Sequence, residues 1–397
     1  MVRVEPDGSI GDKYAIVGEA PASEEVRMGR GFVGPSGKML WPMLRRLAGI
    51  ERWECWVTNL CKHPLDNSEK GDAKLSPEEF ESCQAELLEE LSRVGPTHVL
   101  AVGALAARAL IPGYTRMEVH NGMSYRSQVW ADKYCAWWVT PCWHPAAALH
   151  GDVGKDPLAW AGDAMMHFGP GKSRVPTQVS APPWLPGMIR PTASVISVDT
   201  EGTIDDPICL TWADNVNRYY VPAEHVPVWW NDMKAARPIV VYHNAPWDWG
   251  VLEAMGVPKP WEHPFRDTME LAYLKQTEPQ GLKDLSLRHF GVRMRTWEEV
   301  VMPHYEEVVL AIGAGKVDAG TTITTHSPKT GKAYKKPKVQ YADEVKAMKR
   351  ALENPKLMRE RIGEFPGPSL RFVPEAETIE YATLDPWMTL KVWEVLK

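Results

Sequence analysis

The chain has 397 residues, of which 44% are hydrophobic and 24% charged, and its 45 Lys and Arg against 51 Asp and Glu give a formal net charge of −6. At about 100 to 200 residues per domain, this length predicts two or three globular domains, and the apolar content excludes a mainly disordered or fibrous chain. The longest apolar run, residues 99–111, is shorter than the roughly 18 residues that would indicate a membrane span. A net negative charge by itself argues against nucleic acid as a partner.

The start of the chain and its cysteines indicate the compartment. The first 13 residues are polar and acidic, unlike a secretory leader. Six scattered cysteines without a CxxC pair predict neither a disulfide framework nor a zinc ribbon. We therefore expect a cytoplasmic protein with no membrane partner.

Alternating strand and helix patterns run through residues 1–168. Apolar runs predict buried strands at residues 14–18, 55–59, 98–103 and 136–141. Leu and Met recur at helical spacing over residues 37–48 and 77–94. Strands that alternate with helices predict a parallel sheet covered by helices on both faces, in an α/β/α domain.

A stretch rich in Pro and Gly, residues 169–193, predicts a linker, because it favours neither a helix nor a central strand. A second α/β domain follows at residues 194–397. Its predicted strands form a mixed sheet and occupy residues 194–202, 206–213, 217–222 and 238–244. We treat residues 297–375 as an insertion that holds a hairpin (321–340) and a helix (342–353), and we expect one closing helix at residues 379–396.

Pairs of polar residues recur in the second domain at spacings that put them on one face. Asp199 and Glu201 are two apart on a strand, and Tyr381 and Asp385 are four apart on the expected final helix. Singly, an acid at a strand end or a helix start is more often a solvated cap than a ligand. A third pair, Asn244 and Asp248, is also four apart. The three motifs DxE, NxxxD and YxxxD follow one another in the order seen in DnaQ-like 3′-to-5′ exonuclease domains, and the region resembles the tyrosine-bearing type of family A DNA polymerases and ribonuclease D.

This resemblance, which also includes GLKDLSLRHFG at residues 281–291, implies a ribonuclease H-like fold and two Mg²⁺ or Mn²⁺ ions. It implies that Asp199, Glu201 and Asp385 hold the ion that activates water, with Asp199 bridging both ions. Asp248 would hold the second ion largely through water, Tyr381 would orient the attacking water, and Asn244 would position the terminal nucleotide. The expected activity is removal of 3′ nucleotides from single-stranded or frayed DNA, with RNA as the competing substrate.

The first domain contains GEAPASEE (18–25), GRGFVGPSGKML (29–40), VTNLCKHP (57–64) and WHPAAAL (143–149), and these segments resemble the uracil-DNA glycosylase superfamily, closest to its family four. The resemblance implies that Phe32 stacks on a flipped uracil, that the Asn59 amide pairs with its edge, and that His144 donates to its oxygen. It also implies backbone contacts to the sugar from residues 18–22, which include Gly18 and Glu19, and a phosphate contact at Ser36. Taken alone, Phe32 is equally typical of a core, Asn59 of a cap and His144 of a packed histidine.

Two departures from family four bear on cofactor and mechanism. Its members hold a four-iron four-sulfur cluster on four cysteines, but here only Cys83 falls at a matching place and Val99 stands where a later ligand is expected. We therefore expect no iron–sulfur cluster. Ala20 stands where the best-known family has a water-activating aspartate, so that a nearby acid, Glu19, Glu24 or Glu25, would have to help.

The order of the two domains resembles the front half of some bacteriophage family A DNA polymerases, which implies either a separate polymerase subunit or a truncated polymerase, in a bacterial cytoplasm if the gene belongs to a phage. Residues 329–361 hold 11 Lys or Arg against 4 Asp or Glu, a basic segment that would bind DNA or a partner protein.

The favoured interpretation is a proofreading exonuclease with a uracil-sensing or uracil-excising domain. The alternatives are a uracil-DNA glycosylase repair enzyme with a trimming nuclease, and a non-catalytic processivity module that holds DNA for a polymerase.

Overall fold

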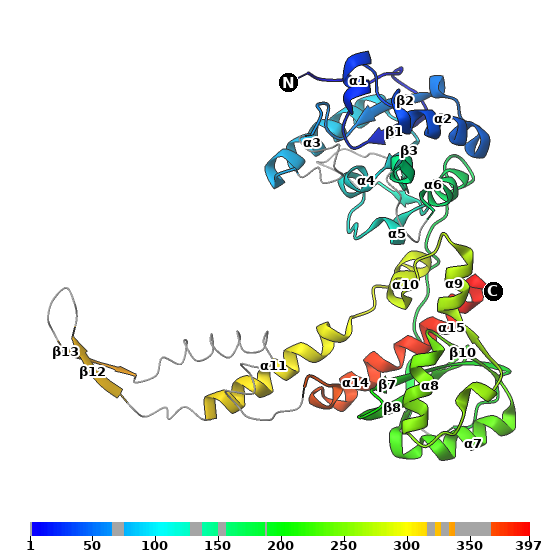
Figure 1. Cartoon of the computed structure of the whole chain (residues 1–397), viewed down its shortest axis with the longest axis vertical. Helices are drawn as coiled ribbons and strands as arrows, with labels where there is room; N and C mark the ends of the chain where they lie inside the picture. Colours follow the sequence, from blue (N-terminus) through cyan, green and yellow to red (C-terminus); the bar gives the residue numbers. More distant parts are fainter. Residues whose placement is uncertain are drawn as a thin grey trace. The chain divides into compact units, whose positions relative to one another are not determined.

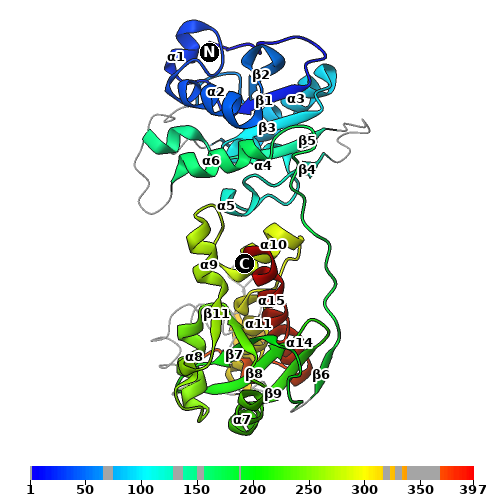
Figure 2. The same cartoon turned by 90° about the vertical axis from the view of Figure 1, so that its right-hand side faces the viewer.

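The structure is a computed structural model that describes residues 2–65, 75–127, 137–149, 156–186, 189–315, 322–326, 333–337 and 367–397. The chain divides into two compact units. Unit 1 comprises Met1–Val179, Met269–Arg293 and Val395–Lys397, and unit 2 comprises Ser180–Thr268 and Met294–Glu394. Figures 1 and 2 label the elements in two views. The predicted α/β class is confirmed.

Unit 1 is built on a five-stranded sheet of order β2-β1-β3-β5-β4. Neighbouring strands run parallel except β4, which is antiparallel to β5. The strands are β1 (Tyr14–Gly18), β2 (Cys55–Asn59), β3 (His98–Val102), β4 (Tyr125–Arg126) and β5 (Trp138–Cys142). The carboxyl ends of β1 and β2 lie side by side, since Gly18 pairs with Asn59.

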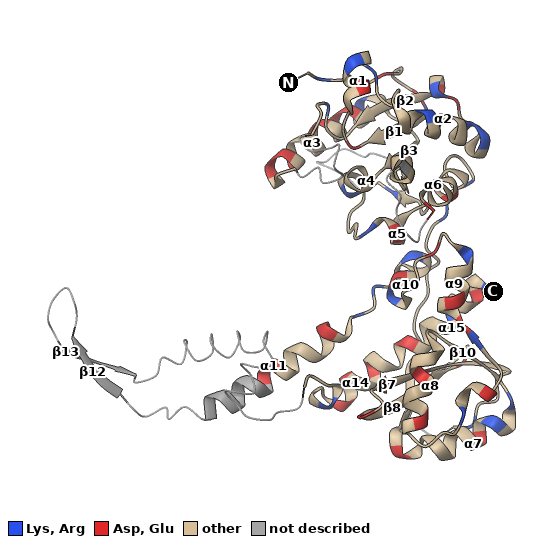
Figure 3. Cartoon of the chain, viewed as in Figure 1, with Lys and Arg blue, Asp and Glu red and all other residues tan. Residues whose placement is uncertain are grey.

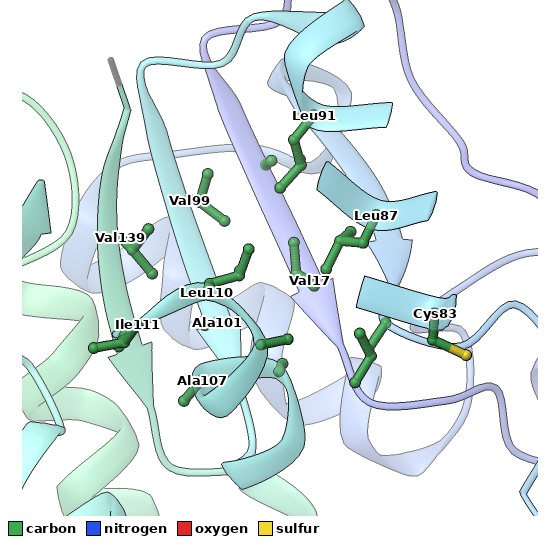
Figure 4. Packing of buried hydrophobic residues seen from close by; sticks show 14 of the residues in the cluster. Val17, Cys83, Leu87, Leu91, Val99, Ala101, Ala107, Leu110, Ile111 and Val139 are labelled. Carbon is green, nitrogen blue, oxygen red and sulfur yellow. The ribbon is translucent and has the colours of Figure 1, made fainter. Parts of the chain in front are cut away.

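Helices cover both faces of this sheet because successive strand residues point to opposite sides. Ile16, Val57 and Leu100 pack with α2 (Pro35–Ala48) and α6 (Pro157–Met166) on one face. Val17, Val99 and Val139 pack with α3 (Pro77–Val94) and α4 (Ala104–Leu110) on the other. Figure 4 shows Leu87 and Leu91 of α3 near Val17 on the face of the sheet that α3 and α4 cover. The helices of unit 1 are α1 (Ser23–Met28), α2 (Pro35–Ala48), α3 (Pro77–Val94), α4 (Ala104–Leu110), α5 (Met117–His120), α6 (Pro157–Met166), α9 (Thr268–Lys275) and α10 (Leu282–Phe290).

Unit 2 is built on a six-stranded mixed sheet of order β11-β10-β7-β8-β9-β6. Strands β7, β8 and β9 form an antiparallel meander, whereas β10 runs parallel to both β7 and β11. The strands are β6 (Trp184–Pro186), β7 (Val195–Gly202), β8 (Pro207–Ala213), β9 (Arg218–Pro222), β10 (Ile239–Tyr242) and β11 (Phe265–Asp267). A separate hairpin joins β12 (Thr322–His326) and β13 (Ala333–Pro337).

Two hydrophobic clusters support the sheet of unit 2. One joins Ile196 and Val240 to residues of α7 (Val226–Ala236) and α8 (Ala245–Ala254). The other joins Cys209 to residues of α11 (Trp297–Gly315) and α14 (Glu375–Ala382). The helices of unit 2 are α7 (Val226–Ala236), α8 (Ala245–Ala254), α11 (Trp297–Gly315), α14 (Glu375–Ala382) and α15 (Leu384–Leu396).

The expected single closing helix is wrong, because the chain forms α14 and α15 with a break at Thr383. Pro386 has no N–H to donate to the carbonyl of Ala382, four residues earlier. That carbonyl instead accepts a hydrogen bond from Thr211 Oγ1 at 3.1 Å. Tyr381 and Asp385 therefore belong to different helices rather than to one face of one helix.

The compact units also differ from the predicted domains. Part of the predicted linker forms the edge strand β6, and Met269–Arg293 belongs to unit 1 although it lies within the predicted second domain. Arg288 of α10 explains the second difference, because its fully buried guanidinium donates to the carbonyls of Val119 and Asn121 and pairs with Asp163. The helix expected at residues 342–353 lies outside the described residues. Among the described helices, none is both long and apolar enough to span a bilayer.

Candidate functional site

Gly18, Phe32 and Asn59 meet at the carboxyl ends of β1 and β2. A Cβ atom added to Gly18 would lie 2.3 Å from Asn59 Oδ1 and 2.8 Å from Phe32 Cζ. Both side chains are buried, and the backbone of Phe32 is left-handed with φ of +52°. A glycine at position 18 is therefore needed for the ring and the carboxamide to approach each other.

A buried lysine fixes the chain around Asn59. Lys62 Nζ donates to the carbonyl of Asn59 and to Thr58 Oγ1, each at 2.7 Å, and pairs with Glu90 of α3 at 2.6 Å. A charge removed from water needs such partners. The sequence did not single out Lys62, because a lysine just after a strand is usually exposed.

His144 follows β5 and is half-buried. Its Nδ1 accepts a hydrogen bond from the backbone N–H of Ala146 at 3.2 Å. An acceptor nitrogen bears no proton, so in the neutral ring the proton lies on Nε2. The preceding residue is also fixed, since the N–H of Trp143 donates to Oδ1 of the fully buried Asn121 at 2.8 Å.

The acids that were candidates for activating water already accept hydrogen bonds. Glu19 Oε1 accepts from the N–H of Leu105 in the first turn of α4 at 2.9 Å. The buried Glu25 carboxylate accepts from the N–H groups of Ala22 at 3.1 Å and Gly34 at 2.8 Å. The exposed Glu24 pairs with Arg27 at 2.9 Å. In this arrangement Glu19 and Glu25 order the loops around the pocket.

Ser36 lies in the first turn of α2, where backbone N–H groups have no partners within the helix. A Cβ atom on the next residue, Gly37, would lie 1.9 Å from the carbonyl oxygen of Phe32, so the helix begins directly against the pocket. This helix has no acidic residues, and Figure 3 shows its basic residues in blue. An anion is favoured at such a helix start.

The cysteines near Cys83 do not fit an iron–sulfur cluster, which needs four thiolates. Cys83 Sγ lies 2.7 Å from Cys61 Sγ, and Val99 is fully buried in β3. Burial, and then the contact with Cys83, raise the pKa of the Cys61 thiol, which favours the protonated form. Two cysteines cannot supply four thiolate ligands.

In unit 2, three of the predicted carboxylates surround Tyr381. Burial first, and then the charges of Glu201, Asp385 and Asp199, raise the pKa of its hydroxyl well above the usual range. The hydroxyl therefore stays protonated. Asp199 and Glu201 lie on one face of β7, as their spacing predicts.

The carboxylate of Asp248 and the backbone of Asn244 both form hydrogen bonds within unit 2. Both the backbone N–H and the hydroxyl of Thr200, whose side chain points away from the face of Asp199 and Glu201, donate to Asp248 Oδ1 at 2.8 Å. Burial raises the pKa of Asp248 to about 8. Asn244 stands at the N-cap position of α8 with a left-handed backbone and no side-chain cap hydrogen bond, and its backbone N–H donates to Asp267 Oδ1 at 3.1 Å. Within the described ranges, no group of three or more His, Cys, Asp or Glu residues is arranged to hold a metal ion.

A family model described as the uracil DNA glycosylase superfamily matches residues 5–161. The type-4 uracil-DNA glycosylase of Pyrobaculum aerophilum is 31% identical over 160 residues, which cover 38% of this chain and 79% of that protein. The type-4 enzyme of Archaeoglobus fulgidus is 32% identical over 143 residues, covering 35% of this chain and 67% of that protein.

These relatives correct the predicted enzyme class. The prediction that the chain is a metal-dependent 3′-to-5′ exonuclease is wrong, because its relatives are glycosylases. In the part of unit 2 that the structure describes, Asp248 Oδ1 accepts hydrogen bonds from Thr200, and Tyr381 and Asp385 belong to successive helices that meet at Thr383. The resemblance of residues 194–397 to DnaQ-like domains finds no support in these comparisons. The resemblance of the first domain to glycosylases is supported, both by the family match and by the share of each relative that the chain covers. The chain belongs to the uracil-DNA glycosylase superfamily.

Proposed function

We propose that unit 1 is a uracil-DNA glycosylase that removes uracil from DNA. The observation that supports this best is the close approach of Gly18, Phe32 and Asn59, which brings an aromatic ring and a carboxamide to one place. An enzyme that acts on a base must take it out of the stack, hold its face and recognise its edge. The name of the curated relatives, type-4 uracil-DNA glycosylase, favours the same activity.

Asn59 selects uracil by its hydrogen-bonding edge. Its Nδ2 donates to O4 of uracil, and its Oδ1 accepts from N3–H. Cytosine presents an amino group and an unprotonated N3 at these positions, so both hydrogen bonds would be lost and buried groups left unpaired. Lys62, which holds the Asn59 carbonyl, keeps the strand end from turning.

His144 assists the departure of the base. The C1′–N1 bond breaks with its electron pair going to uracil, and the N–H of His144 Nε2 donates to O2, where negative charge develops. Water adds its oxygen to C1′ and releases one proton, which neutralises the departing anion directly or through solvent. Because Ala20 offers no carboxylate, stabilisation of the anion supplies most of the rate in this proposal.

The test is a duplex labelled on one strand that contains a single uracil. After incubation with the full chain and treatment with alkali, we expect one strand break at the uracil and none in the matched thymine duplex. We expect the same result in EDTA, because hydrogen-bond donors stabilise the leaving group. An intact strand at all enzyme concentrations contradicts the proposal.

A histidine variant separates chemistry from binding. We expect His144→Gln to lower the single-turnover rate by about 100-fold to 1,000-fold, as for the loss of one donor to a developing anion, while affinity for the duplex changes little. His225→Gln, at an exposed histidine of unit 2, is the matched control and keeps the parent rate. Equal rates for both variants would remove His144 from the mechanism.

A further inference from the structure

The backbone of Phe32 has a conformation that its side chain disfavours. Its φ of +52° lies in the left-handed region, where a Cβ atom crowds the following carbonyl. A residue other than glycine keeps such a conformation only where its surroundings hold it. The groups that bind the carbonyls of residues 31 and 32 can supply that restraint.

Two side chains bind these carbonyls. Trp41 Nε1 at 2.9 Å and Arg52 Nη1 at 3.2 Å both donate to the carbonyl of Phe32, and Arg52 Nη2 donates to that of Gly31 at 2.8 Å. A guanidinium presents its donors in a rigid planar fork. Arg52 thus holds two successive carbonyls at a set spacing, which defines the turn.

Arg52 is itself held in place. Its guanidinium lies over the Trp41 ring, 4.7 Å from the centroid, and its Nη2 pairs with Asp7 Oδ2 at 3.0 Å. Asp7 forms two backbone hydrogen bonds with Val57 of β2, at 2.8 and 3.0 Å. Because Val57 lies two residues before Asn59, this chain of contacts ties the turn at Phe32 to the strand of Asn59.

We propose that Arg52 and Trp41 are positioning residues that hold Phe32 in its left-handed conformation, so that its ring forms one wall of the uracil pocket. The role in catalysis rests on the proposed glycosylase function. Neither residue touches the base. They act through the backbone of the turn, and their loss lets Phe32 relax to negative φ and swing its ring away from Gly18.

Arg30 provides a matched control. Its Nη2 pairs with the same carboxylate oxygen of Asp7 at 2.7 Å, but its side chain is exposed and its guanidinium is directed to Asp7 rather than to the turn. Arg30→Lys therefore weakens the contact with Asp7 and spares the turn. Arg52→Lys keeps a positive charge but replaces the fork with a single ammonium, and Trp41→Phe keeps a ring but removes the N–H.

The experiment compares the parent, Arg52→Lys, Trp41→Phe and Arg30→Lys in the full chain. We expect Arg52→Lys to lower kcat/KM for uracil excision about tenfold or more, with weaker binding of a duplex that contains an uncleavable uracil analogue. Trp41→Phe should have a smaller effect, and Arg30→Lys none. The pH profile should keep its shape in all four, because no titrating group is changed.

Crystal structures of the parent and Arg52→Lys supply a readout that does not depend on activity. We expect φ of Phe32 to become negative in the variant while the rest of unit 1 is unchanged. A variant whose Phe32 keeps positive φ, or which binds and excises like the parent, overturns the proposal. A parent chain that does not excise uracil contradicts the proposed function, and the conformation of Phe32 in the two structures still decides what Arg52 does.

Discussion

At the scale of single residues, the pocket of unit 1 depends on the absence of a side chain at position 18 as well as on the side chains of Phe32 and Asn59. Gly18 lacks the Cβ atom that would meet both Asn59 and Phe32. These three residues come from separate segments of the sequence: the parallel pairing of β1 with β2 brings Gly18 beside Asn59, and the turn before α2 adds Phe32. The pocket thus depends both on strand register and on the turn at Phe32.

We expect Gly18→Ala to reduce uracil excision strongly while unit 1 remains folded. Its new methyl group would displace the Asn59 carboxamide, the Phe32 ring or both, at a typical cost of about 1 to 3 kcal/mol. The measurements are the single-turnover excision rate and the urea midpoint. Gly367→Ala is the control, since a Cβ there meets nothing within 4 Å. Parent-like excision by Gly18→Ala would mean that uracil binds elsewhere.

The sequence indicated the residues of this pocket only through a resemblance to a family. It did not indicate the neighbouring residues that fix the backbone around Phe32 and Asn59. Arg52 stands in a polar segment, and Trp41 has the spacing of a core residue in α2. Their importance arises from the turn at Phe32, whose φ no local pattern predicts. Lys62 is a similar case, because its burial depends on Glu90, 28 positions away in α3.

At the scale of elements, apolar periodicity predicted the sheets well and the helix ends less well. The four expected strands of residues 1–168 match β1, β2, β3 and β5, because each is a short apolar run that is buried on both faces. The expected single closing helix was wrong because Pro386 has no backbone N–H to donate, a fact that the spacing of apolar residues does not reveal. The mixed sheet of unit 2 was expected, although the short edge strand β6 was not.

The segment around α10 predicts a pH dependence. Burial alone would raise the pKa of Glu278, but the hydrogen bond from His289 and the charges of Arg288, His289 and Arg174 lower it to about 2. A carboxyl whose folded pKa is depressed stabilises the fold above its unfolded pKa, and this contribution is lost as pH falls through the folded value. Unit 1 should therefore lose stability from about pH 4.5 down to about pH 2.

We expect Glu278→Gln to be less stable than the parent at pH 7 and to lose less stability than the parent on acidification. Urea unfolding at a series of pH values, followed by a probe within unit 1, measures both. Glu253→Gln, at an exposed glutamate of α8, should follow the parent curve. Parallel curves for Glu278→Gln and the parent would show that this carboxyl does not titrate with folding.

At the scale of the whole molecule, the chain passes from unit 1 into unit 2 and back. Hydrogen exchange on the full chain tests this division, because amides that open together exchange with a common free energy. We expect the amides of α10 to be protected together with β1 and β3, and Asp163→Asn, which weakens a partner of Arg288, to lower their protection in common. Exchange of α10 in step with β7 and β8 would assign it to unit 2 instead.

The net charge of −6 is an average over segments that differ in charge. The basic segment at residues 329–361 lies almost entirely outside the described residues, so its contact with DNA stays a prediction, as does a polymerase partner. The family of unit 1 nevertheless favours DNA. An average over the chain does not register such local differences in charge.

The return of the chain to unit 1 also sets an order on its synthesis. Arg288 is made more than a hundred residues after Val179, where the first part of unit 1 ends. At roughly 5 to 20 residues per second, a nascent chain waits several seconds for it. During that interval the carbonyl of Asn121 lacks the Arg288 guanidinium and Asp163 has Arg174 but not Arg288 as a partner, while Ser180–Thr268 emerges from the ribosome. Completion of the first unit thus follows translation of most of the second sheet.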